Sequence, residues 1–225
     1  MWKPVHPAGM VAVAGFFIDA HEVTFADYAA FVSALSSKSP PALPARCAFK
    51  KDFKPSACTD VSALTSQHPA ACVDWCDAFA YCAFNGKRLC GKTGGGPVDP
   101  VLPLEDQWTA ACGGSAGHMY PYGDGMSPNA SACATLIGNA GTNPSTVASH
   151  PSCVGSVPGL FDMSGNVWEW EDQCSSSPMD GGKDICTVRG GSVTNPLDQA
   201  TCFVAQRYAL DFRYYNTGIR DCADP

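Results

Sequence analysis

Three carboxylates lie close together in the segment GLFDMSGNVWEWEDQC. Glu169 and Glu171 alternate with two tryptophans, so in a β-strand their side chains would share one face. Neighbouring carboxylates can act as a general acid and a general base. A solvated strand face explains Glu171 and Asp172 equally well. Trp168 and Trp170 could stack on a ligand, but large aromatic side chains more often fill a core, and we expect them there.

Thirteen cysteines are the second source of candidate chemistry. Zinc sites usually contain CxxC pairs or closely spaced histidines, whereas these cysteines show no CxxC spacing and the five histidines are isolated. Disulfides are therefore the better interpretation, and they indicate an oxidising compartment. Because thirteen is an odd number, one thiol should stay free or link two chains into a covalent dimer. For Cys72, Cys76 and Cys82 we expect disulfides to neighbouring loops rather than a redox cluster.

The elements that must position these groups are short. Glycine and proline are frequent, which predicts many turns. The segment GMVAVAGFFIDAHEVT predicts one or two strands. Apolar spacing and end signals predict three helices, at residues 24–35, 73–86 and 104–114. Short strands at 166–172 and 186–193 precede an irregular tail. We therefore expect a single α+β domain over residues 1–225.

Composition excludes several classes of function. The net charge is -7 and the 14 basic residues are scattered, which argues against binding to nucleic acid or to an anionic membrane surface. No apolar run is long enough for a membrane span. No signal segment is recognisable at the N-terminus, so a secreted chain would be present here in its mature form. The cysteines favour an extracellular, periplasmic or cell-surface location.

The order of several motifs resembles a known family. The segments VDWCDAFAYCAFNGKRL, EDQWTAAC, YPYGD, GLFDMSGNVWEWEDQC, VRGGS and NTGIR follow one another as in the formylglycine-generating enzyme (sulfatase-modifying factor) family. The cysteine content is similar to that of a cysteine-rich branch of secreted bacterial proteins. The resemblance implies a loop-rich, disulfide-stapled C-type-lectin-like fold with two main helices on a small twisted antiparallel sheet. It also implies buried ion pairs for Arg189 and Arg220.

The family's enzymes bind copper(I) through two cysteines placed three and eight residues after the serine of the GGS motif. Those positions hold Asn195 and Ala200 in this chain. An amide and a methyl group cannot provide the soft thiolates that copper(I) requires. Cys202 is the one thiol close to these positions, and Cys222 is available as its disulfide partner. The resemblance therefore implies either a non-catalytic chain or, as the alternative, an oxidase of protein cysteines that uses copper and Cys202.

The resemblance also implies a structural calcium ion. In the family, the asparagine and glutamate of the GNVWE segment contribute to that site, and Asn166 and Glu169 occupy the matching positions. Hard oxygen donors on a tight turn suit calcium. We expect calcium to raise the thermal stability of the protein. We also expect Cys174 to close a short loop with Cys186.

These observations favour a secreted or surface-attached, non-catalytic binding module. Residues 194–217 would present a loop surface to a protein or another surface ligand. The tyrosine, arginine and asparagine side chains there are typical of interfaces. The expected contact residues are Phe203, Tyr208, Phe212, Arg213, Tyr214, Tyr215 and Asn216. A sharper hypothesis is a receptor whose C-terminal segment is diversified, as in variable proteins that share this fold.

Overall fold

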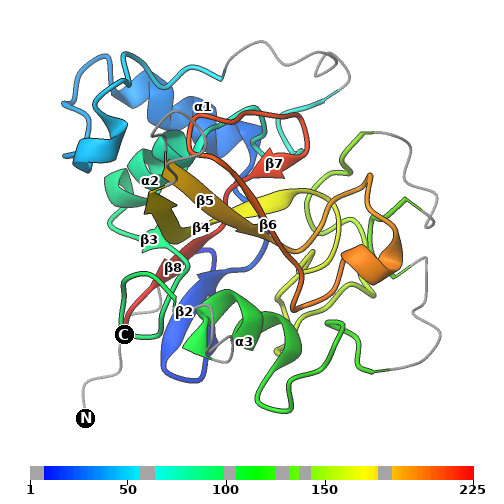
Figure 1. The fold of residues 1–225 in the computed structure, drawn as a ribbon. Coiled ribbons are helices and arrows are strands. Elements are labelled where there is room, and N and C mark those ends of the chain that lie inside the picture. The colour runs from blue at the N-terminus through cyan, green and yellow to red at the C-terminus, as the bar shows by residue number, and fades with distance from the viewer. Residues whose placement is uncertain (1–7, 56–63, 99–104, 125–131, 137–142, 177–183) are drawn as a thin grey trace.

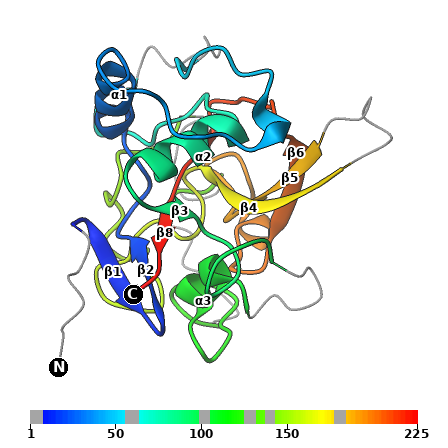
Figure 2. The same ribbon diagram turned by 90° about the vertical axis from the view of Figure 1, so that its left-hand side faces the viewer.

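The structure is a computed structural model that describes residues 8–55, 64–98, 105–124, 132–136, 143–176 and 184–225. It contains two four-stranded sheets, with the strand orders β1-β2-β8-β3 and β6-β5-β4-β7. Figure 1 and Figure 2 show α1 and α2 together at one end of the molecule, and α3 with β1 and β2 at the other. Long ordered loops join these elements. No helix in the described ranges is long and apolar enough to cross a membrane.

The first sheet joins segments from both ends of the described chain. Strands β1 (Met10–Val13) and β2 (Phe16–Asp19) form an antiparallel hairpin. Gly15 in its turn has a φ of 88°, which glycine adopts without steric cost. Strand β8 (Asp221–Ala223) lies between β2 and β3 (Arg88–Leu89) and pairs antiparallel with both. The residues at the C-terminus of the sequence are therefore central to the sheet that the N-terminal hairpin begins.

Local sequence signals start and stop the helices. Helices α1 (Phe25–Ala34) and α2 (Trp75–Phe84) each begin with a capping box, in which Thr24 or Asp74 exchanges hydrogen bonds with the aspartate three residues later. Helix α2 ends at Asn85, and Gly86 follows with a φ of 69°. Asp106 caps the shorter α3 (Gln107–Gly113) by accepting the Trp108 N–H. The three predicted helices are confirmed.

The second sheet holds the tryptophan-rich segment. Strand β4 (Trp168–Ser176) pairs antiparallel with β5 (Asp184–Arg189), with a register shift between Trp170 and Cys174. Strand β6 (Ala205–Ala209) adds to the outer side of β5. Strand β7 (Thr217–Gly218) pairs with β4 in parallel, so the sheets are not purely antiparallel. The tail expected to be irregular thus contributes β6, β7 and β8.

Two apolar clusters fill the space between these elements. The larger joins α1 and α2 to one face of the second sheet, and Trp168 and Trp170 are buried in it, which confirms their assignment to the core. The indole N–H of Trp170 donates to the Val73 carbonyl at 3.1 Å, so its polar atom is satisfied. The smaller cluster gathers around Trp108 and Ile18, between α3 and the first sheet.

Five disulfides link described residues that lie far apart in the sequence. They join Cys47 to Cys76, Cys90 to Cys222, Cys112 to Cys202, Cys133 to Cys153 and Cys174 to Cys186. The predicted Cys174–Cys186 bridge is confirmed.

The partner of Cys202 is not the available Cys222, and the disulfide predicted for Cys82 was wrong. Cys202 pairs with Cys112 on α3, and Cys222 pairs with Cys90, because the ends of β3 and β8 lie side by side. Cys72 and Cys76 are disulfide-bonded as expected, whereas Cys82 is a free thiol buried in α2. Cys58 lies outside the described residues.

Candidate functional site

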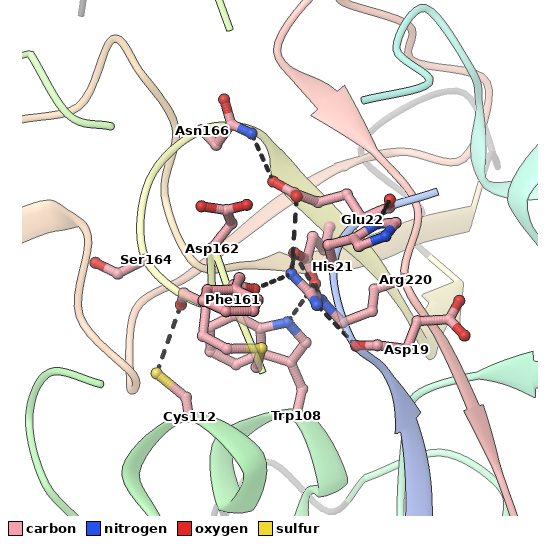
Figure 3. A network of polar contacts seen from close by, with 12 residues as sticks. Asp19, His21, Glu22, Trp108, Cys112, Phe161, Asp162, Ser164, Asn166 and Arg220 are labelled. Atoms are coloured by element: carbon pink, nitrogen blue, oxygen red, sulfur yellow. Dashed lines mark hydrogen bonds and ion pairs between the residues drawn. The ribbon is translucent and has the colours of Figure 1, made fainter. Parts of the chain in front are cut away.

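Glu169 of β4 belongs to a buried network of charged groups, and Figure 3 shows Arg220, Glu22 and Trp108 of this network. Arg220 donates to both of its carboxylate oxygens, at 2.8–3.0 Å, and the indole N–H of Trp108 donates to one of them at 2.6 Å. Arg220 also donates to the carbonyls of Asp19 and Phe161. Both charged side chains are almost fully buried. The network confirms the expected ion pair of Arg220 and ties β8 to β2 and β4.

The same network extends to the turn before β4. Asn166 has a φ of 58°, a left-handed conformation that asparagine tolerates, and its side-chain amide donates to Glu22 at 2.9 Å. Figure 3 shows Glu22 between Asn166 and Arg220. Its Oε2 atom is buried, has no hydrogen-bond partner and lies 4.0 Å from the Arg220 guanidinium. Burial, followed by the charge of Asp162, raises the pKa of Glu22 well above its usual value.

Calcium ligation by Asn166 and Glu169 remains a prediction. The oxygens of Glu169 accept bonds from Arg220 and Trp108, and Oδ1 of Asn166 accepts the Ser145 N–H at 2.8 Å. No group of three or more His, Cys, Asp or Glu side chains among the described residues is arranged to hold a metal. The unpartnered Oε2 of Glu22 is the one observation in this network that favours a further cation.

The calcium proposal predicts a higher melting midpoint when calcium is added to chelator-treated protein. A bound ion stabilises only the native state that holds it, and the increase would grow with ligand concentration. Differential scanning calorimetry with and without calcium measures it. The variant Glu22→Gln, which keeps Asn166 and Glu169, tests whether the unpartnered carboxylate oxygen contributes to the site. An unchanged midpoint for the unmodified chain would remove the proposal.

A second buried ion-pair group lies beside the first. Arg189 of β5 contacts Glu171 at 2.9 Å and Asp106 at 2.9 Å. Glu171 is fully buried, which excludes for this residue the solvated strand face that was one of its two interpretations. Burial, followed by the charge of Asp106, raises the pKa of Glu171 well above its usual value. A carboxyl without access to solvent or substrate is poorly suited to acid–base chemistry, so this pair orders the loops instead.

The positions where the family's enzymes bind copper contain no thiol. The Asn195 side chain accepts hydrogen bonds from the backbone N–H and the hydroxyl of Ser192, at 3.0 and 2.7 Å. Ala200 is buried, and its carbonyl accepts a hydrogen bond from Ser164. Cys202 is bonded to Cys112. The residues at these positions therefore do not fit copper(I), which needs soft, free thiolates.

Cys82 is the free thiol of the described chain, and it lies where another protein chain cannot reach it. It is fully buried, and it contacts the carboxyl of Asp221. Burial raises the pKa of the Cys82 thiol well above its usual value and that of Asp221 to about 8. A deeply buried, protonated thiol is a poor nucleophile. A covalent dimer through this cysteine would therefore require the protein to unfold locally.

The expected contact residues form a row of aromatic rings beside β6. Tyr208 and Phe212 stack with ring centroids 4.3 Å apart, and Phe212 contacts Tyr214 at 6.0 Å. Tyr214 and Tyr215 follow at 4.6 Å. Tyr214 is 44% exposed. Aromatic contacts of this kind position rings with little loss of side-chain entropy on binding.

Two of the expected contact residues hold this segment in place instead. Arg213 donates to Asp74 at 2.8 Å and lies 2.9 Å from Asp77, which fixes the segment to the start of α2. Asn216 is 6% exposed, and its amide donates to the hydroxyls of Ser192 and Thr194. These two side chains therefore anchor the segment, and ligand contact by the aromatic rings stays a prediction.

Phe203 lies apart from that row, on the opposite face of the second sheet. It is 37% exposed and borders a groove of about 610 Å³ that crosses β4, β5 and β6. Apart from Phe203, the groove residues were not predicted as contact residues, because no local motif marks them. They are Pro97, Val98, Gln173, Cys174, Ser175, Thr187, Arg189, Phe203, Ala205 and Arg207.

Comparisons with known proteins agree with the motifs. Residues 3–224 match the family described as "Sulfatase-modifying factor enzyme 1-like domain". The mouse protein named "Inactive C-alpha-formylglycine-generating enzyme 2" is 33% identical over 136 residues, which are 58% of this chain and 39% of that protein. The mouse formylglycine-generating enzyme is 28% identical over 205 residues, covering 73% of this chain and 50% of that protein. The chain thus spans half or less of the length of these relatives.

Solved structures show the same fold at low sequence identity. PvdO from Pseudomonas aeruginosa is 20% identical with a TM-score of 0.64, over 93% of this chain and 80% of that one. The P3c variant of Major Tropism Determinant is 16% identical with a TM-score of 0.52, over 97% of this chain and 53% of that one. The α+β fold is therefore the formylglycine-generating-enzyme type of C-type-lectin-like fold. With the family match over residues 3–224, the chain belongs to the sulfatase-modifying factor enzyme 1-like domain family.

Proposed function

We propose that the protein is a non-catalytic binding module of an oxidising compartment, which presents the surface around β6 and residues 210–216 to a protein ligand. The observation that carries this proposal is the Cys112–Cys202 disulfide. It consumes the one thiol near the copper positions, and Asn195 and Ala200 supply no replacement. A relative whose name describes it as inactive supports the view that the fold is retained without the reaction.

The location follows from the same bonds. Disulfides persist in extracellular and periplasmic compartments and are reduced in the cytosol. Three of the bridges span 90 residues, 132 residues and 29 residues, so they connect segments that are distant in the sequence rather than local turns. We infer that the protein works outside the cytoplasm, as a secreted or surface-attached chain.

The test of the binding surface is site-specific photo-crosslinking. A photoreactive phenylalanine in place of Tyr214, which is 44% exposed, should form a discrete adduct with a partner in the native setting. The same group in place of Leu136, which is 54% exposed and outside the surface, is the matched control. Equal labelling from both positions, or none from Tyr214, would refute a binding role for this surface.

A diversified receptor is the sharper form of the proposal. The structural similarity to Major Tropism Determinant concerns the fold alone, but the exposed rings of Phe203 and Tyr214 lie in the segment that would vary. Sibling sequences that differ mainly between residues 193 and 218 would support it, whereas differences spread evenly along the chain would contradict it.

A further inference from the structure

Strand β6 has a free edge, in the sense that no described strand pairs with its outer side. It is the terminal strand of its sheet, and Ala205, Gln206 and Arg207 are exposed. The Leu210 N–H donates to the Asp184 carbonyl, which continues the register in which Ala209 faces Ile185. In an antiparallel ladder, every second residue exchanges backbone hydrogen bonds with the neighbouring strand. Since Leu210 bonds to β5, Tyr208 and Gln206 do so as well. The backbone N–H and C=O groups of Ala205 and Arg207 therefore point outward.

The groove lies on the face of the sheet toward which the side chains of Ala205 and Arg207 point. Tyr208 packs into the core on the other face, as the alternation of side chains along a strand requires. The opposite wall is formed by Pro97 and Val98. Gln173 donates to the Val98 carbonyl at 3.2 Å, so this wall is fixed to β4. The groove is thus preformed beside the free edge.

The charge of the groove selects its ligand. Arg189 on its floor is neutralised by Glu171 and Asp106. Arg207 hydrogen-bonds to the Ser175 hydroxyl but forms no ion pair with any carboxylate in the described part of the chain. On a chain of net charge -7, this exposed guanidinium at the centre of β6 has no carboxylate partner among the described residues. A guanidinium matches a carboxylate in geometry and charge.

We propose that β6 is a docking strand for an extended peptide of a partner protein, with a carboxylate side chain opposite Arg207 and an apolar side chain two residues away. Strand addition supplies affinity through backbone hydrogen bonds and specificity through alternate side chains. The Cβ atoms of residues directly opposite each other on paired strands are about 5 Å apart, so a carboxylate there can reach the Arg207 guanidinium. The apolar side chain then lies over the small Ala205, toward Phe203.

This inference rests on the proposed function and deepens it, because it names the class of ligand for the β6 part of the proposed surface. We test it by selecting displayed random peptides on the intact, oxidised chain. The peptides have about seven residues, which is the length of an ordinary strand. We expect the enriched peptides to carry Asp or Glu two positions from an apolar residue. A synthetic peptide of the enriched sequence is then titrated by fluorescence anisotropy.

Two variants test the backbone contact and the charge contact separately, and a third variant is their control. Ala205→Pro removes an outward N–H that the β5 ladder does not use, and it should weaken the peptide about tenfold. Arg207→Glu reverses the charge and should weaken it by about tenfold or more. Gln206→Glu places the same charge on the other face and should change the affinity less than about twofold. The melting midpoint of each variant shows whether it is folded.

Hydrogen exchange on the unmodified chain provides a readout that needs no variant. The outward amide of Arg207 should gain protection when the peptide binds. The inference is overturned if no peptide is enriched over a disulfide-rich control protein. It is also overturned if the Ala205 and Arg207 variants leave the peptide affinity unchanged and the Arg207 amide gains no protection from the peptide. If a crosslink from Tyr214 persists while these measurements fail, the binding function stands and only strand addition is wrong.

Discussion

Arg220→Met should destabilise the protein by about 3–5 kcal/mol, because it leaves a buried carboxylate without its counter-charge. Glu169 would keep only the Trp108 hydrogen bond, and the carbonyls of Asp19 and Phe161 would lose their donors. Urea denaturation of the oxidised protein, followed by tryptophan fluorescence, measures the loss. An expected consequence is a loosened contact between β8 and its neighbours, since Arg220 immediately precedes that strand.

The matched control removes both charges. Arg220→Met combined with Glu169→Gln should recover part of the loss, because a neutral amide is less costly to bury than an unpaired carboxylate. Arg213→Met is a second control, since Arg213 also contacts two aspartates but lies nearer the surface. A loss below about 1 kcal/mol for Arg220→Met, the range of exposed ion pairs, would contradict the structural role of the network.

Removal of the Cys112–Cys202 bridge should have an effect of similar size. The bridge closes a segment with a sequence separation of 90, and the chain-entropy estimate for such a loop is about 4–5 kcal/mol. We expect Cys112→Ser/Cys202→Ser to lower the free energy of unfolding accordingly in the same urea assay. Cys174→Ser/Cys186→Ser, with a separation of 12, should cost about 3 kcal/mol. Equal losses for the two pairs would contradict the loop-length argument.

The single variant Cys112→Ser distinguishes the non-catalytic binding module from the copper-dependent oxidase. It frees the Cys202 thiol without restoring thiols at Asn195 or Ala200. Since copper(I) needs more than one soft ligand for tight binding, titration should show no tight site in this variant or in the native chain. Tight copper binding that Cys202→Ser abolishes would revive the oxidase reading.

Local chemistry explains what the sequence could predict. Thr24, Asp74 and Gly86 begin and end helices through contacts within a few residues, so apolar spacing and capping were sufficient to place α1 and α2. Cys174 and Cys186 are near in sequence and flank a hairpin, which made their bridge predictable. The motif order placed the chain in its family, which the match over residues 3–224 confirms.

Long-range packing explains the rest. Glu171 is buried because Asp106 and Arg189 come to it from other elements, and its own segment gives no sign of them. Cys202 is paired with a helix cysteine 90 residues earlier. Cysteine spacing alone allows many other partners for it. Arg207 gains its significance only when β6 becomes an edge strand, because exposure of one side of a strand is a property of the whole sheet.

The position of β8 in the first sheet has a consequence for biosynthesis. Asp221 donates its N–H to Asp19, 202 residues earlier, and β8 separates β2 from β3. Until that segment has left the ribosome, the N-terminal hairpin has no neighbour on its inner side. The first sheet must therefore assemble after translation of nearly the whole domain, and the Cys90–Cys222 bond can seal it only then.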